Sequence, residues 1–98
     1  MFLKNLNKMS EISEIQIKVI KPRDGLLGFA SFILNETLYL SSIGIFSRIN
    51  GSGYRITYPT KKVGDTDLQI FHPISKQLSL EIEQTIISKA KEVFDEHY

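Results

Sequence analysis

Four cations and no acid lie between residues 43 and 62, in the stretch IGIFSRINGSGYRITYPTKK: Arg48, Arg55, Lys61 and Lys62. The guanidinium fork of arginine donates hydrogen bonds in a plane that matches a phosphate, and lysine adds a point charge. These residue types therefore predict a surface that contacts the phosphates of a nucleic acid. The alternative interpretation is an ordinary solvated strand face.

Two tyrosines, Tyr54 and Tyr58, lie in the same stretch. Aromatic side chains exposed on a sheet can stack on unpaired bases, so these rings are candidates for such contacts. Spacing alone favours the other possibility, in which both tyrosines pack in the core.

Catalytic chemistry has few candidate residues in this chain. There is no cysteine, and no sequence spacing joins His72 or His97 to a nucleophile or to a metal-binding set. Asp65 and Asp67 are interpreted as solvated turn residues. We therefore expect a non-enzymatic protein with no catalytic residues, no metal, no cofactor and no small-molecule substrate.

A predicted β-hairpin positions the basic stretch. The dipeptide at residues 50–51, Asn-Gly, separates two β-prone runs, and both residues tolerate the positive φ that a tight hairpin turn needs. On the second arm, Arg55 points to the face opposite the tyrosines because strand side chains alternate. Pro59 ends the arm by removing a backbone donor.

The rest of the chain predicts more strands and then one helix. Strands are expected over residues 12–19, 26–34, 37–47 and 68–71, with turns at 22–25 and 35–36 and an exposed loop over 60–67. From Ser75 the hydrophobic period changes to near 3.6, which predicts a helix of about 15–20 residues capped by Ser75 or Ser79, with Glu81 and Glu83 in its first turns. Its apolar stripe comprises Ile82, Ile86, Ala90 and Val93, widened by Ile87 and Phe94.

Length and charge bound the organisation of the chain. Ninety-eight residues, 42% of them hydrophobic, indicate one small domain, with residues 1–11 as an N-terminal extension and 12–98 as the domain. No apolar run approaches the ~20 residues of a membrane span, and we expect a cytoplasmic protein without membrane contact. The net charge is +1, distributed as +4 over residues 1–78 and −3 over residues 79–98.

Several short motifs occur in an order that resembles the stage V sporulation protein G (SpoVG) family. They are Ile-Gly-Ile at residues 43–45, Asn-Gly at 50–51, Tyr-Pro-Thr-Lys-Lys at 58–62 and Phe-His-Pro-Ile at 71–74. The resemblance covers roughly residues 12–94. It implies a small dimeric α+β protein of bacteria, named for septation and sporulation, that regulates by binding DNA and RNA and has no catalytic activity.

The resemblance also implies which residues contact nucleic acid. Basic residues after the Pro-Ser motif of the family correspond to Lys61 and Lys62. A second basic group near the start of the terminal helix falls on Ser79 and Glu81, which leaves Lys76 as the positive residue nearby. This departure predicts weaker phosphate contact at the helix start.

Together, these observations predict an α+β fold, a twisted antiparallel sheet of four to five strands with a C-terminal helix, assembled as a homodimer. The expected function is a non-enzymatic, SpoVG-like regulator that binds DNA or RNA through the hairpin and the loop after it. The expected contact residues are Lys61, Lys62, Arg55, Arg48 and Lys76. The alternative is a protein-interaction module of cell division without affinity for nucleic acid.

Overall fold

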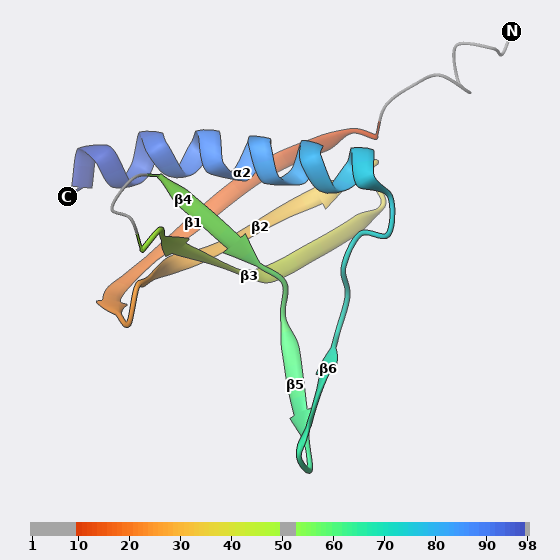
Figure 1. The fold of residues 1–98 in the computed structure, drawn as a ribbon. Helices are drawn as coiled ribbons and strands as arrows, with labels where there is room; N and C mark the ends of the chain where they lie inside the picture. Colours follow the sequence, from red (N-terminus) through yellow and green to blue (C-terminus); the bar gives the residue numbers. More distant parts are fainter. Residues whose placement is uncertain (1–9, 50–52, 98) are drawn as a thin grey trace, which may run out of the picture.

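A computed structural model describes residues 10–49 and 53–97 of the protein (Figure 1). The elements are β1 (Ile12–Arg23), β2 (Leu26–Leu34), β3 (Leu38–Ser47), β4 (Tyr54–Thr57), β5 (Thr60–Val63), β6 (Thr66–Gln69) and α2 (Lys76–His97). Strands β1 to β4 form an antiparallel sheet in chain order, and β5 and β6 form a separate two-stranded sheet. The predicted α+β architecture is confirmed.

Tight turns connect the first three strands. Asp24 and Gly25 both have positive φ, 53° and 89°, so β1 and β2 are joined by a two-residue turn whose twist matches that of the strands. Pro22 therefore belongs to β1 rather than to the turn, and it is tolerated because β1 is an edge strand. Asn35 and Glu36 also adopt positive φ between β2 and β3.

The core lies between α2 and one face of the sheet. Figure 1 shows the helix lying across the strands. The buried members of the core are Ala30 and Phe32 from β2, Ile43 and Ile45 from β3, and Ile82, Ile86, Ala90 and Phe94 from α2. The predicted helical stripe is confirmed, except that Phe94 rather than Val93 is the buried residue of the last turn. Burial of each large side chain contributes roughly 1.5–3 kcal/mol, so this layer holds the fold together.

The start of the helix is capped by Ser75. Its hydroxyl accepts a hydrogen bond from the Leu78 N–H at 3.2 Å, and its carbonyl accepts one from the Ser79 N–H at 2.9 Å. Of the two predicted caps, Ser75 is the one that the structure shows. The expectation that Glu81 and Glu83 lie in the first turns needs correction, because the helix begins at Lys76 and its first turn contains no acidic residue.

Strand β3 is bulged where it passes β2. The register shifts between the Ala30–Ile43 and Phe32–Leu40 pairs, and Ser42 in this bulge has a φ of 66°. The bulge re-aims the side chains after it, which places Ile43 in the core.

Residues 60–67 do not form the expected loop, because they contain β5 and most of β6. They belong to the β5–β6 hairpin, which projects away from the body of the molecule (Figure 1). The predicted last strand at 68–71 is displaced, because β6 runs from Thr66 to Gln69 and Phe71 packs against the main core instead. The segment forms strands despite its polar composition, and hydrophobic residues alternate with polar ones at Leu68 and Ile70.

Two sequence predictions concern residues that the structure does not describe. The predicted Asn-Gly turn at residues 50–51 and most of the predicted N-terminal extension lie outside the described residues. Within the described part, Glu11 and Asn35 are joined by two hydrogen bonds. The Asn35 N–H donates to the Glu11 carbonyl at 2.7 Å, and the Glu11 N–H donates to Asn35 Oδ1 at 2.8 Å.

Candidate nucleic-acid interface

The face of the β1–β4 sheet that α2 does not cover is here called the open face. Directly paired residues of an antiparallel sheet point the same way, so the strand register defines which side chains share it. Gly44 lies between two buried isoleucines in the sequence of β3 and therefore faces away from the helix. It pairs with Phe29 and Thr57, and Phe29 pairs in turn with Lys18. One row of the open face thus runs across all four strands.

Basic side chains gather on the open face. A second row runs from Arg23 through Leu26 and Phe46 to Arg55, because each of these residues pairs with the next. Arg48 follows Phe46 by two residues, and its N–H donates to the Gly53 carbonyl at 3.1 Å, which continues the pairing beyond β4. The cations on this face are therefore Lys18, Arg23, Arg48 and Arg55, and the register-paired residues that share it include no Asp or Glu.

Arg55 is held against an aromatic ring. Its guanidinium carbon lies 4.6 Å from the centroid of the Phe46 ring, and the side chain is exposed. Such a cation–π contact contributes about 0.5–1 kcal/mol at an exposed site and fixes the plane of the guanidinium. Because Arg55 is exposed, its guanidinium is accessible to a phosphate.

The two tyrosines proposed as stacking candidates lie on the other face. The Tyr54 ring centroid is 5.7 Å from that of Phe94, and its hydroxyl donates to Asp95 Oδ1 at 2.7 Å. Tyr58 packs edge-on against Phe71, with 6.1 Å between centroids. The stacking hypothesis for this pair is therefore wrong, because both rings are committed to the contact with α2 and the core.

Both phenols have raised pKa values. Burial is the main cause for Tyr54, and the hydrogen bond and negative charge of Asp95 raise its pKa further. Burial also raises the pKa of Tyr58, with a smaller contribution from the charge of Glu83. The buried Tyr58 hydroxyl has no hydrogen-bond partner among the described residues.

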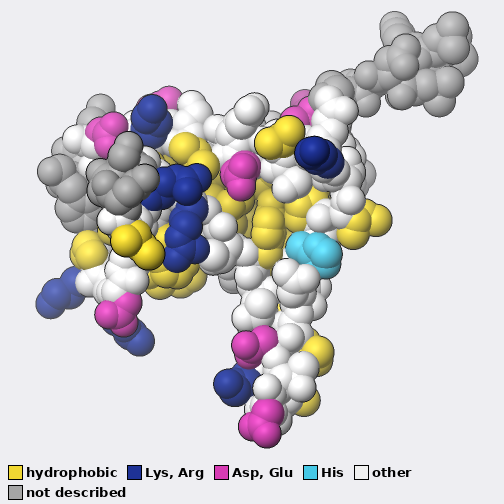
Figure 2. Space-filling model, viewed as in Figure 1, with side chains coloured by type: hydrophobic (Ala, Val, Ile, Leu, Met, Phe, Trp, Pro, Cys, Tyr) yellow, Lys and Arg dark blue, Asp and Glu magenta, His cyan; other side chains and the backbone are white. Residues whose placement is uncertain are grey.

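Lys61 and Lys62 lie in β5 and point to opposite faces of the hairpin. Lys61 pairs with Leu68, on the same face as Val63, whereas Lys62 pairs with Asp67. In Figure 2, hydrophobic side chains lie along one side of the projecting hairpin, and acidic and basic side chains are visible along the other. The sequence neighbours therefore do not form one basic patch, and the carboxylate opposite Lys62 offsets part of its charge.

Lys76 is remote in the fold from the two arginines. It is the first residue of α2, and the helix covers the face of the sheet opposite Arg48 and Arg55. A shallow surface pocket beside it is lined by Gln77, Leu80, Glu81 and Gln84. The five predicted contact residues are thus divided among the open face, the two sides of the hairpin and the helix start.

Sequence reasoning missed four residues of the open face: Lys18, Arg23, Phe29 and Tyr39. Phe29 is 37% exposed and Tyr39 is 66% exposed, although both belong to central strands. The alternation of β1 placed Lys18 on the polar side of its strand. Its proximity to Phe29 depends on the register between strands, which one strand's pattern does not contain.

Metal-ligating residue types are scattered over residues 10–49 and 53–97. Within this part of the chain no three His, Cys, Asp or Glu side chains cluster closely enough to hold a metal ion. His72 is exposed, and its Nδ1 lies 3.3 Å from the Pro73 carbonyl oxygen, a local contact. None of the described helices is both long enough and apolar enough to cross a membrane.

Comparison with protein families gives a match over most of the chain. The model of the SpoVG family matches residues 9–92, which include β1 to β6 and most of α2. The chain belongs to the SpoVG family. A search of curated proteins found no significant match.

Membership of the SpoVG family supports a role related to sporulation or septation. SpoVG proteins are not known as an enzyme family. The matched segment contains the open face and the hairpin, so both belong to the SpoVG domain itself.

Proposed function

We propose that this SpoVG protein is a non-enzymatic cytoplasmic regulator that binds DNA or RNA. The observation that carries the proposal is the composition of the open face, where Lys18, Arg23, Arg48 and Arg55 occur without a carboxylate among the paired residues. Fixed positive charge without local compensation attracts the phosphate backbone and releases its condensed counterions on binding.

Within this proposal the contact residues have different roles. Arg48 and Arg55 lie on one face and provide the main phosphate track, and Arg55 is already oriented by Phe46. Lys61 and Lys62 would contact the ligand from the projecting hairpin. Because they point to opposite faces of the hairpin, only one of them can contact a given stretch of nucleic acid. Lys76 contributes only at the end of a long ligand, because α2 lies behind the sheet.

Binding of labelled random-sequence DNA and RNA at about 50 and 200 mM salt tests this function. The double variant Arg48→Ala/Arg55→Ala should weaken binding on all sequences and lower the slope of log K against log salt by about 1.4–1.8, since two phosphate contacts are lost. Lys61→Ala/Lys62→Ala should have a smaller effect. The matched control is Lys89→Ala/Lys91→Ala on α2, which removes the same charge away from the open face and should leave the slope unchanged.

We also propose that the protein acts as a homodimer formed through the hairpin. Val63, Leu68 and Ile70 are 50%, 49% and 61% exposed, and the pairing of Lys61 with Leu68 places the first two on one side. An isolated two-stranded hairpin is marginally stable in water, so an uncovered apolar side favours docking on a second copy. A dimer of this kind would leave the open face and Lys62 accessible and would cover Lys61, which shares its side of the hairpin with Val63 and Leu68.

The second candidate function is a protein-interaction module of cell division. The same apolar side of the hairpin favours it, because this surface suits a different protein as well as a second copy. The two candidates make opposite forecasts for nucleic acid. Undetectable affinity for both DNA and RNA at about 50 mM salt, in a protein shown to be folded, would decide for the interaction module.

A further inference from the structure

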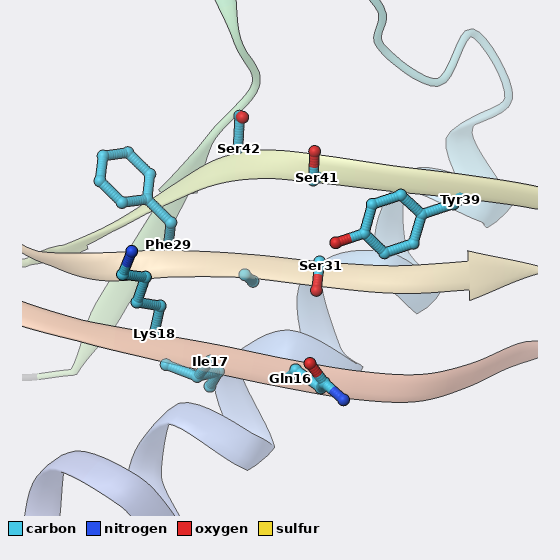
Figure 3. Close-up of a pocket in the computed structure, with 9 residues that line it drawn as sticks. Gln16, Ile17, Lys18, Phe29, Ser31, Tyr39, Ser41 and Ser42 are labelled. Atoms are coloured by element: carbon cyan, nitrogen blue, oxygen red, sulfur yellow. The ribbon is translucent and has the colours of Figure 1, made fainter.

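The open face contains a shallow pocket beside the bulge of β3. Its volume is about 410 Å³, and it is lined mainly by residues of β1, β2 and β3 that point away from the helix. Figure 3 shows Phe29 and Tyr39 at opposite ends of the pocket, with serine side chains between them and Lys18 beside Phe29. None of its lining residues is acidic.

Each group of side chains in this pocket matches a part of a nucleotide. The rings of Phe29 and Tyr39 offer flat apolar surfaces for bases, and Ser31, Ser41 and Gln16 offer hydrogen-bonding groups for base edges or sugars. Lys18 pairs with Phe29 across β1 and β2, so its charge lies next to the first ring.

The distance between the rings indicates how many bases fit. Tyr39 pairs with Ile33, which follows Phe29 by four residues in β2. Four residues of strand span roughly 13 Å, so one base cannot contact both rings and each ring would receive its own base. Such contacts need bases that are not paired with a second strand, because the bases of a duplex stack on one another inside the helix and their faces are not accessible.

We propose that the pocket is a stacking platform for two nucleotides of a single-stranded nucleic acid. Phe29 and Tyr39 each receive a base, and Lys18 contacts a phosphate beside the base on Phe29. The arginines of the adjoining row guide the nucleic-acid strand toward β4. This inference rests on the proposed function and adds to it the form of the ligand, single-stranded rather than double-stranded. RNA and DNA share the chemistry, and the serine hydroxyls and Gln16 are the groups that can respond to a 2′-hydroxyl.

Fluorescence anisotropy with labelled oligonucleotides of about 12 residues provides the test, using single-stranded RNA, single-stranded DNA and duplex DNA of one sequence. We expect the full chain to bind a single strand more tightly than the duplex. Tyr39→Ala should weaken single-strand binding about 5- to 150-fold, the range for loss of one stacked base. Tyr39→Phe should restore it, because the ring is retained.

Leu38→Ala is the matched control. Leu38 is 51% exposed in the same strand, but it pairs with Leu34, whose side chain packs on the core side of the sheet. Its removal takes away similar apolar area from the other face and should leave affinity unchanged. Lys18→Ala should lower the salt slope by about 0.7, the value for one contact with a single strand. Ultraviolet crosslinking of a bound strand should attach it to Phe29 or Tyr39.

Three results would overturn the platform. The first is an affinity of Tyr39→Ala equal to that of the wild-type protein, while the arginine variants bind more weakly. This result would leave the proposed function standing and place the ligand outside the pocket. Absence of binding to every oligonucleotide would overturn both proposals. A change in sedimentation caused by Tyr39→Ala, without a change in affinity, would identify the pocket as a contact between protein chains.

Discussion

The β1–β4 sheet and the β5–β6 hairpin are both antiparallel and both have one apolar side, but only the sheet has that side covered. Helix α2 buries Ala30, Phe32, Ile43 and Ile45 almost completely, whereas Val63 and Leu68 of the hairpin remain about half exposed. The same alternating pattern therefore produces a self-sufficient layer in one place and an uncovered surface in the other. The difference indicates that the stability of the domain resides in the sheet and helix, while the hairpin is available for association.

Gly28→Ala should give the largest effect, on the side of the covered sheet. A Cβ at this position would meet the Lys18 carbonyl oxygen and would lie 3.2 Å from Cζ of Phe94. Because the nearest atom is backbone, relief requires the strands to separate, and we expect a loss of about 1–3 kcal/mol or more in the free energy of unfolding. Urea unfolding followed by circular dichroism measures it.

The matched control for Gly28 lies in the hairpin. Gly64 has a φ of 64°, and beyond its chain neighbours no heavy atom of the described residues lies within 4 Å of the place that a Cβ would take. Gly64→Ala should therefore add only left-handed backbone strain of about 1 kcal/mol, confined to the hairpin. Equal losses for the two variants would contradict the division between a stabilising sheet and an associating hairpin.

Leu68→Glu tests the uncovered side of the hairpin. If this side docks on a second copy, a buried carboxylate without a partner should shift the protein from dimer to monomer in sedimentation equilibrium at micromolar concentration. The unfolding of each chain's sheet and helix should be little changed, since Leu68 is not part of the core. Gln69→Glu, on the opposite side of β6, is the control and should keep the dimer. A wild-type protein of only about 11 kDa would end the dimer proposal.

Tyr58→Phe and Tyr54→Phe should have opposite, smaller effects on the covered face. The Tyr58 hydroxyl is buried without a partner among the described residues, so its removal should stabilise the protein by about 1 kcal/mol. The Tyr54 hydroxyl donates to Asp95, and its removal should cost about 1 kcal/mol. Destabilisation by both changes would show that the Tyr58 hydroxyl has a partner in solution.

The smallest effect concerns alkaline pH. Both tyrosines have pKa values above the usual value of about 10, so they hold their protons in the folded state after the unfolded chain has lost them. Stability from this source is complete below pH ~10 and is lost as pH rises through the higher folded-state pKa values. Chemical unfolding between pH 9 and about 11 should show this decrease in the free energy of unfolding. The decrease should be smaller in Tyr54→Phe and in Tyr58→Phe, because each variant lacks one of the two phenols.

The sequence predicted the elements whose pattern is strong and continuous. The strand at 12–19 and the terminal helix each bury one side, so their periods report the fold directly. The strand at 26–34 was predicted from its continuous apolar run, which suggested cover on both faces, whereas Phe29 is 37% exposed on the open face. The β5–β6 hairpin was missed because its strands have four residues each and its polar composition, with Gly64 at the turn, resembles a loop. Its apolar side faces no core residue, so burial gave no additional signal.

The candidate site was only partly predictable, for a different reason. Arg48 follows the first strand of one predicted hairpin and Arg55 lies in its second strand, and the structure places them on one face. Lys18 and Phe29 meet through pairing of strands whose register depends on a bulge in β1. Tyr39 faces the same way only after the register of β2 and β3 is known. A face shared by four strands depends on every register between them.

The irregular shape of β1 has a consequence for solubility. An edge strand exposes unpaired backbone donors and acceptors, which can recruit another chain and begin aggregation. In β1 the register is broken twice, between Ser13 and Gln16 and between Val19 and Arg23, and Pro22 removes a donor near its end. Exposed lysines at 18 and 21 add charge along the same edge. The β1 edge of the sheet is thereby protected from growing by strand addition.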